Sequence, residues 1–400
     1  MTMESKLNQQ KALLPLRYGY LVILAICGFV TSFGAHIVAT NLPSYAEKVG
    51  VGALVIGLLI AVYDFAELFA KPAAGFIADR RGMRLTLLAG LAIFILGSLL
   101  FLVLDPKLLL VVRFIQGLGA AALSTVSITL VARYFSTGRG TAFGIYNAIK
   151  GAGYVIAPAL GGFLVGGYGF EMIFIVSAAV GLCALVLALF LPADPVRGAT
   201  LDDDDDDLSF KEFLLIFREP RLLPVYAVIV INMFLVGILF GFLPVYLHSI
   251  GYTALQSGVL VSVATASYLL VQPFAGRLAD RTNIRMTVLI GLLMAALGVC
   301  AVTFATGLPL VIIVVLAGFG VGTVWTNSDV LVSTLVDQRK LGASMGAAQS
   351  FKEFGDMIGP LLVGLLTQLY GVRVGFLTCG ILALLLLLLL IRSLPSASRA

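Results

Sequence analysis

Two lysines lie inside stretches that are otherwise apolar enough to cross a lipid bilayer. Lys150 is in GIYNAIKGAGYVIAPALGG (residues 144–162), and Lys352 has the matching place in SFKEFGDMIGPLLVG (residues 350–364). A charge at the bilayer centre costs at least about 2.5–3.5 kcal/mol on insertion scales, so it faces the protein interior, water or an opposite charge. We therefore expect both lysines to border a buried cavity, where they either attract an anionic ligand group or pair with acids and adjust a proton site.

Four acidic side chains are the candidate partners of these lysines: Glu67 and Asp329 in other apolar segments, and Glu353 and Asp356 beside Lys352. Asp64, Glu67 and Lys71 lie on roughly one helix face, because their spacing is i, i+3 and i+7. A proton-coupling group must change its proton affinity as a cavity opens, and we favour Glu67 and Asp356 for this role. A static network of interior salt bridges is the alternative that needs no proton chemistry. The predicted proton-coupling or buried charged residues are Asp64, Glu67, Arg113, Asp329, Glu353 and Asp356.

Long apolar helices must position these charges. Of the 400 residues, 60% are hydrophobic and 12% are charged, whereas soluble proteins carry about 25% charged residues. A hydrocarbon core about 30 Å thick needs about 20 apolar residues per helix. The sequence predicts an all-α membrane protein whose twelve transmembrane helices form two pseudo-symmetric six-helix bundles, at 18–42, 53–79, 85–104, 107–133, 141–167, 170–191, 222–248, 253–279, 286–305, 308–336, 342–369 and 373–391.

Lysine and arginine gather in the loops on one side of these helices, which predicts the orientation of the chain. Both termini are then cytoplasmic, and we expect a multi-pass protein of the inner (plasma) membrane. The formal net charge of +5 reflects these loops, so no nucleic-acid partner is expected. Because the four cysteines are scattered singly, the sequence suggests no disulfide framework, metal site or cofactor.

The chain contains an internal repeat. LPSYAEKVG (42–50) recurs as LPVYLHSIG (243–251), and GFIADRRGMR (75–84) recurs as GRLADRTNIR (276–285), both displaced by 201 residues. We therefore predict a bundle at 1–191, a cytoplasmic linker at 192–221 with the spacer run Asp202–Asp207, and a second bundle at 222–400. Two such bundles can rock against each other around a central site, which is the architecture of alternating access.

The loop after the second predicted helix resembles the signature of the major facilitator superfamily, and the motif set resembles its twelve-helix drug:proton antiporters. At this loop, Asp79 ends a helix and could sit against the positive N-terminus of the helix that begins near Gly342, as a latch of the cytoplasmic gate. Ordinary loop anchoring by arginines is the alternative. The predicted gating motif is Gly75, Asp79, Arg80, Gly82 and Arg84, with Gly276, Asp280 and Arg281 in the second copy.

The small residues that follow Lys150, in GAGYVIAPALGG (151–162), resemble the antiporter signature of the fifth helix, and the internal repeat places similar residues after Lys352. They let helices approach closely, and the proline bends the helix; in this family the surface is thought to seal the two halves, although generic packing explains the glycines equally well. The residues are Gly153, Pro158, Gly161, Gly162, Gly355, Gly359 and Pro360.

Arg113 and Gln116 also match the family's fourth-helix motif, and Asp64 is the predicted counter-ion of Arg113. A structural pair and a proton-linked pair remain equal alternatives. The family arrangement implies a central substrate cavity, for which the candidate contacts are His36, Asn41, Lys150, Asn232, Tyr268, Gln272, Trp325, Asn327 and Lys352.

The resemblance implies a secondary transporter and not an enzyme. We expect proton-coupled efflux of a small amphipathic organic substrate by a monomer that needs no cofactor. Two alternatives with the same fold stay open: a lipid or lipid-linked glycan flippase, in which the lysines hold a phosphate headgroup, and an organic-anion transporter.

Overall fold

The structure is a computed structural model, and long helices account for nearly all of the chain that it describes. Backbone placement is described for residues 3–42, 45, 50, 52–104, 108–135, 139–192, 219–281, 283–336 and 338–395; within these ranges, the side chains of 3–17, 79–80, 132, 139–141, 279–281 and 338–343 are left aside.

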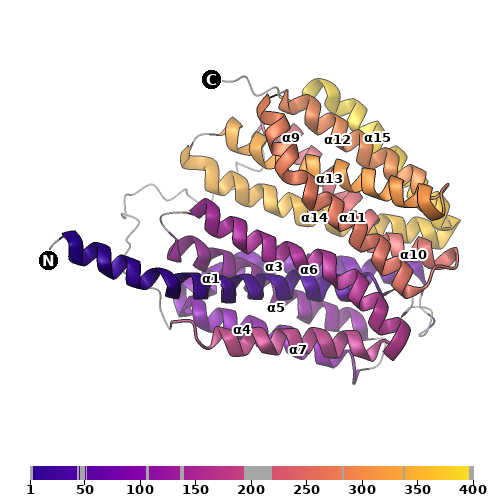
Figure 1. Cartoon of the computed structure of the whole chain (residues 1–400). Coiled ribbons are helices and arrows are strands. Elements are labelled where there is room, and N and C mark those ends of the chain that lie inside the picture. Colours follow the sequence, from indigo (N-terminus) through magenta and orange to yellow (C-terminus); the bar gives the residue numbers. More distant parts are fainter. Residues whose placement is uncertain are drawn as a thin grey trace. The chain divides into compact units, whose positions relative to one another are not determined.

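The first half of the sequence forms six long helices among its described residues (Figure 1). They are α1 (Met3–Ala39), α3 (Ala53–Arg81), α4 (Met83–Leu100), α5 (Leu109–Tyr134), α6 (Arg139–Tyr168) and α7 (Glu171–Ala188).

The second half repeats this order, with its first helix divided into three consecutive pieces. They are α9 (Leu223–Val236), the π-helix η2 (Gly237–Phe242) and α10 (Leu243–Ser249). The helices that follow are α11 (Ala254–Arg281), α12 (Ile284–Val302), α13 (Gly307–Leu335), α14 (Gln338–Tyr370) and α15 (Val372–Ser393).

Each of the twelve predicted helices has a counterpart in the structure. Eleven spans in the described part of the chain are long and apolar enough to cross a membrane. The remaining long helix is α14, whose 33 residues include Lys352, Glu353 and Asp356 near the middle. The first predicted transmembrane helix begins at residue 18, as does the membrane-crossing part of α1, Tyr18–Ala39, and the helix itself extends back to Met3. A search for apolar runs detects only the membrane-crossing part of such a helix.

The chain divides into two compact units. The first unit comprises Met1–Val38, Ala66–Ala157 and Gly169–Thr200, and the second comprises Ala39–Phe65, Pro158–Tyr168 and Leu201–Ala400. The beginning of α3 and the end of α6 therefore group with the second unit. The bundle boundaries predicted from the sequence stay a prediction, and most of the predicted linker, residues 193–218, lies outside the described residues.

Matching helices pack in the same way within each unit. In the first unit α4 packs against α5 and α7, and in the second unit α12 packs against α13 and α15. A Cβ atom added to Gly90 would lie 3.1 Å from the carbonyl oxygen of Gly119, and one added to Gly291 would lie 2.9 Å from that of Gly320. The two glycine pairs are displaced by 201 residues, so the sequence repeat is also a repeat of close helix packing.

The π-helix is the local feature that the hydrophobic pattern did not predict. Pro244 is the second residue after it. Proline has no N–H group for an α-helical bond, and its ring crowds the carbonyl of the residue four positions earlier, which here lies within the π-helix. A wider π turn before the proline accommodates this conflict. The segment also contacts α14, since a Cβ atom on Gly237 would lie 2.7 Å from both the carbonyl oxygen of Asp356 and the Cδ atom of Pro360.

The loops before α4 and α12 have different backbone turns, but in both copies an arginine makes the same kind of hydrogen bond. Gly82 has a φ of 101°, which suits glycine, whereas Asn283 has a φ of −82° and its side chain accepts a hydrogen bond from the backbone N–H of Arg285. Arg84 donates to the carbonyl oxygen of Leu189 at 2.6 Å. Arg285 donates to the corresponding carbonyl of Ile391, so each arginine caps the C-terminal end of the sixth helix of its repeat.

Candidate functional site

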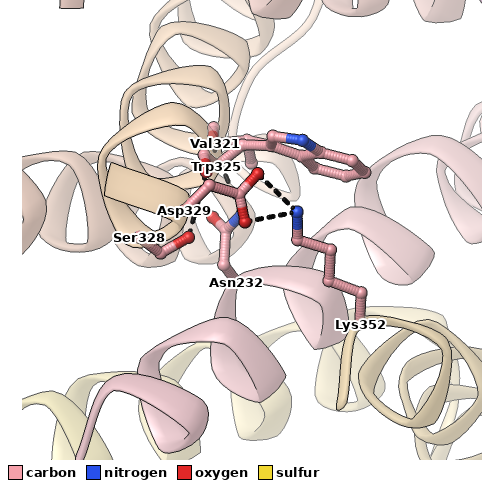
Figure 2. Close-up of polar contacts among 6 residues, drawn as sticks. All are labelled: Asn232, Val321, Trp325, Ser328, Asp329 and Lys352. Carbon is pink, nitrogen blue, oxygen red and sulfur yellow. Dashed lines mark hydrogen bonds and ion pairs between the residues drawn. The ribbon is translucent and has the colours of Figure 1, made fainter. Parts of the chain in front are cut away.

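The strongest polar feature of the second unit is an ion pair between α14 and α13. The ammonium nitrogen of Lys352 lies 2.8 Å from each carboxylate oxygen of Asp329. Figure 2 shows the two side chains reaching toward each other. The side chain of Lys352 is 4% exposed and that of Asp329 is 27% exposed. The structure therefore selects Asp329, among the four acids that the sequence offered, as a direct partner of Lys352.

Aromatic rings surround this ion pair. The ammonium of Lys352 lies 4.6 Å from the ring centroid of Trp325, which is within the range of a cation–π interaction. The Trp325 ring meets that of Tyr268 edge-on at 5.4 Å, and Tyr268 lies 5.9 Å from Phe240. Gln272 hydrogen-bonds to the Tyr268 hydroxyl group. Three of the cavity residues predicted from the sequence, Tyr268, Gln272 and Trp325, thus belong to one cluster with Lys352.

Two buried asparagines on the helices of this unit have different surroundings. Asn232, on α9, donates to the carbonyl oxygen of Val321 at 3.4 Å, and its own amide oxygen is buried without a hydrogen-bond partner among the described residues. Asn327 donates to Thr323 on its own helix and to Ala275 on α11. Asn327 therefore links α13 to α11, and its amide oxygen, like that of Asn232, is buried without a hydrogen-bond partner among the described residues.

The first unit contains a buried hydrogen-bond chain that joins three helices. Arg113 is 1% exposed and donates to Gln116 at 2.8 Å. Gln116 donates to Ser98 on α4 at 3.1 Å, and Ser98 shares a hydrogen bond with Ser177 on α7. The sequence singled out Arg113 but not the two serines, which look like ordinary small residues in an apolar helix. The predicted pairing of Arg113 with Asp64 stays a prediction.

We expect Gln116→Ala to destabilise the protein more than the double change Arg113→Val with Gln116→Ala. The single change removes an acceptor of a buried guanidinium, and leaving such a donor unsatisfied costs about 1–3 kcal/mol. The second repeat has Val314 and Ala317 at the aligned positions, so the double variant reproduces an arrangement that the fold already accommodates. Thermal unfolding in detergent measures the difference. A double variant with a lower Tm than the single variant would contradict this account.

The remaining charged and polar candidates of the first unit lie on α1, α3 and α6. The His36 ring contacts Tyr154 edge-on at 4.5 Å and is under the electrostatic influence of Arg113 and Lys150. Lys150 accepts a hydrogen bond at its backbone oxygen from Ser32, which ties α6 to α1.

Glu67 pairs with a lysine of its own helix. Its carboxylate lies 2.7 Å from the ammonium of Lys71, the residue that the spacing had placed on the same face. Three further candidates belong to the second unit, where Asn41 is buried and Asp64 and Glu353 are partly exposed.

The residues of the predicted gating motif are described only in part. Gly75 and Gly276 pack alike, with ordinary contacts to Thr125 and Thr326. Gly82 and Arg84 form the turn and the helix cap described above. The side chains of Asp79, Arg80, Asp280 and Arg281 lie outside the described residues, so the latch on α14 stays a prediction.

The predicted helix-packing residues are all buried, and Gly153, Gly162, Gly355 and Gly359 approach neighbouring backbone closely. Gly153 packs against α1, and Gly355 and Gly359 pack in the corresponding way against α9. Within the second unit, Gly162 lies against Ala254 of α11. The last part of α6, which also contains Pro158 and Gly161, is thereby joined to α11.

A serine that the sequence did not indicate completes this contact between α6 and α11. The backbone N–H of Ala159 donates to the Ser262 hydroxyl group at 3.0 Å. A neighbouring contact joins α3 to α14, where Gly57 lies against Pro360 and Gly52 lies against the side chain of Gln368. Helices of the first repeat thus contact helices of the second repeat inside the second unit.

Comparisons with known proteins agree with this architecture. The family model for the Major Facilitator Superfamily matches residues 24–268 and 248–400. Multidrug resistance protein MdtG of Escherichia coli O17:K52:H18 (strain UMN026 / ExPEC) is 25% identical over 381 residues, which cover 92% of this chain and 93% of MdtG.

Solved structures show the same fold at low sequence identity. A bacterial homolog of the human lysosomal transporter Spinster, in an inward-facing and unoccupied conformation, has a TM-score of 0.80 at 17% identity and covers 95% of this chain and 98% of that chain. The nucleoside transporter NupG has a TM-score of 0.78 at 14% identity, with coverage of 94% and 98%. These matches confirm the predicted resemblance and fold class. Because the sequence identities to the solved structures are low, those structures show only that the fold is shared.

Proposed function

The chain belongs to the major facilitator superfamily, and we propose that it exports amphipathic organic compounds in exchange for protons. Like its relatives, the chain is a multi-pass membrane transporter and not an enzyme. The similarity to MdtG along nearly the whole chain favours export over uptake. We place the protein in the inner membrane with both termini in the cytoplasm, as the positive loops predict.

The single observation that carries the proposal is the Lys352–Asp329 pair beside Trp325. A transporter that exchanges an organic compound for a proton needs a titratable group next to an apolar or aromatic contact surface, and Asp329 and Trp325 supply both on α13. The partial exposure of Asp329 leaves this carboxylate reachable. Alternating access then exposes the same site to each side of the membrane in turn.

Transport in liposomes under an imposed pH gradient tests the proposal. The purified full chain is reconstituted with the membrane potential clamped, and three probes are followed: ethidium, carboxyfluorescein and a fluorescent phospholipid. We expect ethidium or carboxyfluorescein to accumulate in an acidic lumen and to leave when an ionophore collapses the gradient. Movement of the phospholipid alone would identify a flippase, and probes that ignore the gradient would overturn proton-coupled export.

A further inference from the structure

We propose that Asp329 and Trp325 form a binding site for an organic cation, and that Lys352 is an internal cation that occupies this site until substrate displaces it. The inference rests on the proposed function and narrows its substrate class. It also changes the role of Lys352, which the sequence suggested as an attractor of anions.

The three side chains of the site differ in how deeply they are buried. Lys352 is the deepest, with a side chain that is 4% exposed, whereas Asp329 is 27% exposed. Trp325 is also partly exposed. An approaching ligand therefore meets a carboxylate and an indole face before it meets the ammonium, and a carboxylate repels an anion.

The contacts of Lys352 are those of a complete ammonium-binding site. Both carboxylate oxygens of Asp329 lie 2.8 Å from the ammonium of Lys352 and balance its charge. The indole ring of Trp325, with its centroid at 4.6 Å, covers another side of the ammonium. Aromatic rings combined with an acid are the usual surroundings of bound organic ammonium groups. A protonated amine or a quaternary cation in the place of the Lys352 Nζ atom would keep the same contacts. An anion would first have to separate Lys352 from both Asp329 and Trp325.

Carboxylates and a hydrogen-bond acceptor lie around the site. Tyr268 is under the electrostatic influence of two carboxylates, Asp329 and Asp356. The buried amide oxygen of Asn232 is a further acceptor whose hydrogen-bonding capacity is unused in the described structure. Carboxylates and hydrogen-bond acceptors thus surround the ammonium of Lys352, an environment that suits a cation or a donor of hydrogen bonds.

A second acid lies about one helical turn from Lys352 on the same helix. Asp356 follows Lys352 by four residues on α14, and side chains at i and i+4 lie on the same face of a helix. Binding of a cation would therefore exchange one lysine–carboxylate pair for another and would not leave the ammonium of Lys352 in the protein interior alone.

Intrinsic fluorescence tests the proposal directly, because Trp325 is the one tryptophan of the chain. Two probes of the same shape and opposite charge, tetraphenylphosphonium and tetraphenylborate, are titrated into the purified wild-type protein in detergent. We expect tetraphenylphosphonium alone to change the Trp325 emission in a saturable way. A saturable change with tetraphenylborate, or none with tetraphenylphosphonium, would overturn the cation site whatever the outcome of the transport assay.

Lys352→Gln tests whether the lysine competes with the ligand. If the ion pair fills the site in about nine molecules of ten, removal of the ammonium should tighten tetraphenylphosphonium binding about tenfold, because only vacant sites bind. The control Lys352→Arg keeps an internal cation and should stay near the wild-type affinity. Equal or weaker binding by Lys352→Gln overturns the competition. If that variant does not fold, Lys352→Met, which also removes the ammonium but keeps a long apolar side chain, takes its place, and binding no tighter than that of the wild type overturns the competition.

Discussion

Asp329→Asn is expected to abolish gradient-driven transport of ethidium. The variant removes the charge that holds both Lys352 and the incoming cation, and truncating one member of a buried charge pair costs about 2–5 kcal/mol in binding. It also leaves the ammonium of Lys352, which is 3% exposed as a residue, without its carboxylate partner at 2.8 Å. The measurement is the initial rate of ethidium uptake in liposomes, normalised to the amount of folded protein.

A second variant separates loss of function from loss of folding. Breaking a buried ion pair by removing one partner destabilises a protein by about 3–5 kcal/mol, whereas removing both partners is much less costly. We therefore expect Asp329→Asn with Lys352→Gln to regain stability in detergent and to stay inactive toward ethidium. Recovery of ethidium transport by this double variant would show that the carboxylate serves structure alone.

The helical architecture could be predicted from the sequence, because hydrophobic length alone identifies helices that cross a membrane. All twelve predicted helices have counterparts, and the repeat signalled by the two GFIADRRGMR-like segments reappears as paired helix contacts. The family resemblance, inferred from the same motifs, is confirmed by the family model. The end of α1 that projects beyond the apolar run was missed, since hydropathy carries no information on a polar helical extension.

The charged residues of the candidate site could be predicted from the sequence, but which acid pairs with Lys352 could not. Buried charges were recognisable because each one is costly in an apolar helix. The choice of Asp329 over Glu67, Glu353 or Asp356 depends on which helix faces α14, and one sequence does not contain that information. The roles of Ser98 and Ser262 also had no signal, because a serine in an apolar helix usually bonds to its own backbone.

A reversible crosslink between α3 and α14 is expected to stop transport. Alternating access requires helices of the two repeats to separate on each side of the membrane in turn. Gly52 precedes α3, and a Cβ atom added there would lie 3.1 Å from the Cδ atom of Gln368, a flexible side chain that a cysteine would replace. Both positions are exposed, so cysteines there are accessible to an oxidant.

Transport by Gly52→Cys with Gln368→Cys, measured before oxidation, after oxidation and after reduction, tests alternating access most directly. The single variants Gly52→Cys and Gln368→Cys control for the native cysteines and for direct damage by the oxidant. We predict that the oxidised double variant retains no gradient-driven ethidium transport and that a reductant restores it. Undiminished transport by fully crosslinked protein would contradict a mechanism in which these helices separate during each cycle.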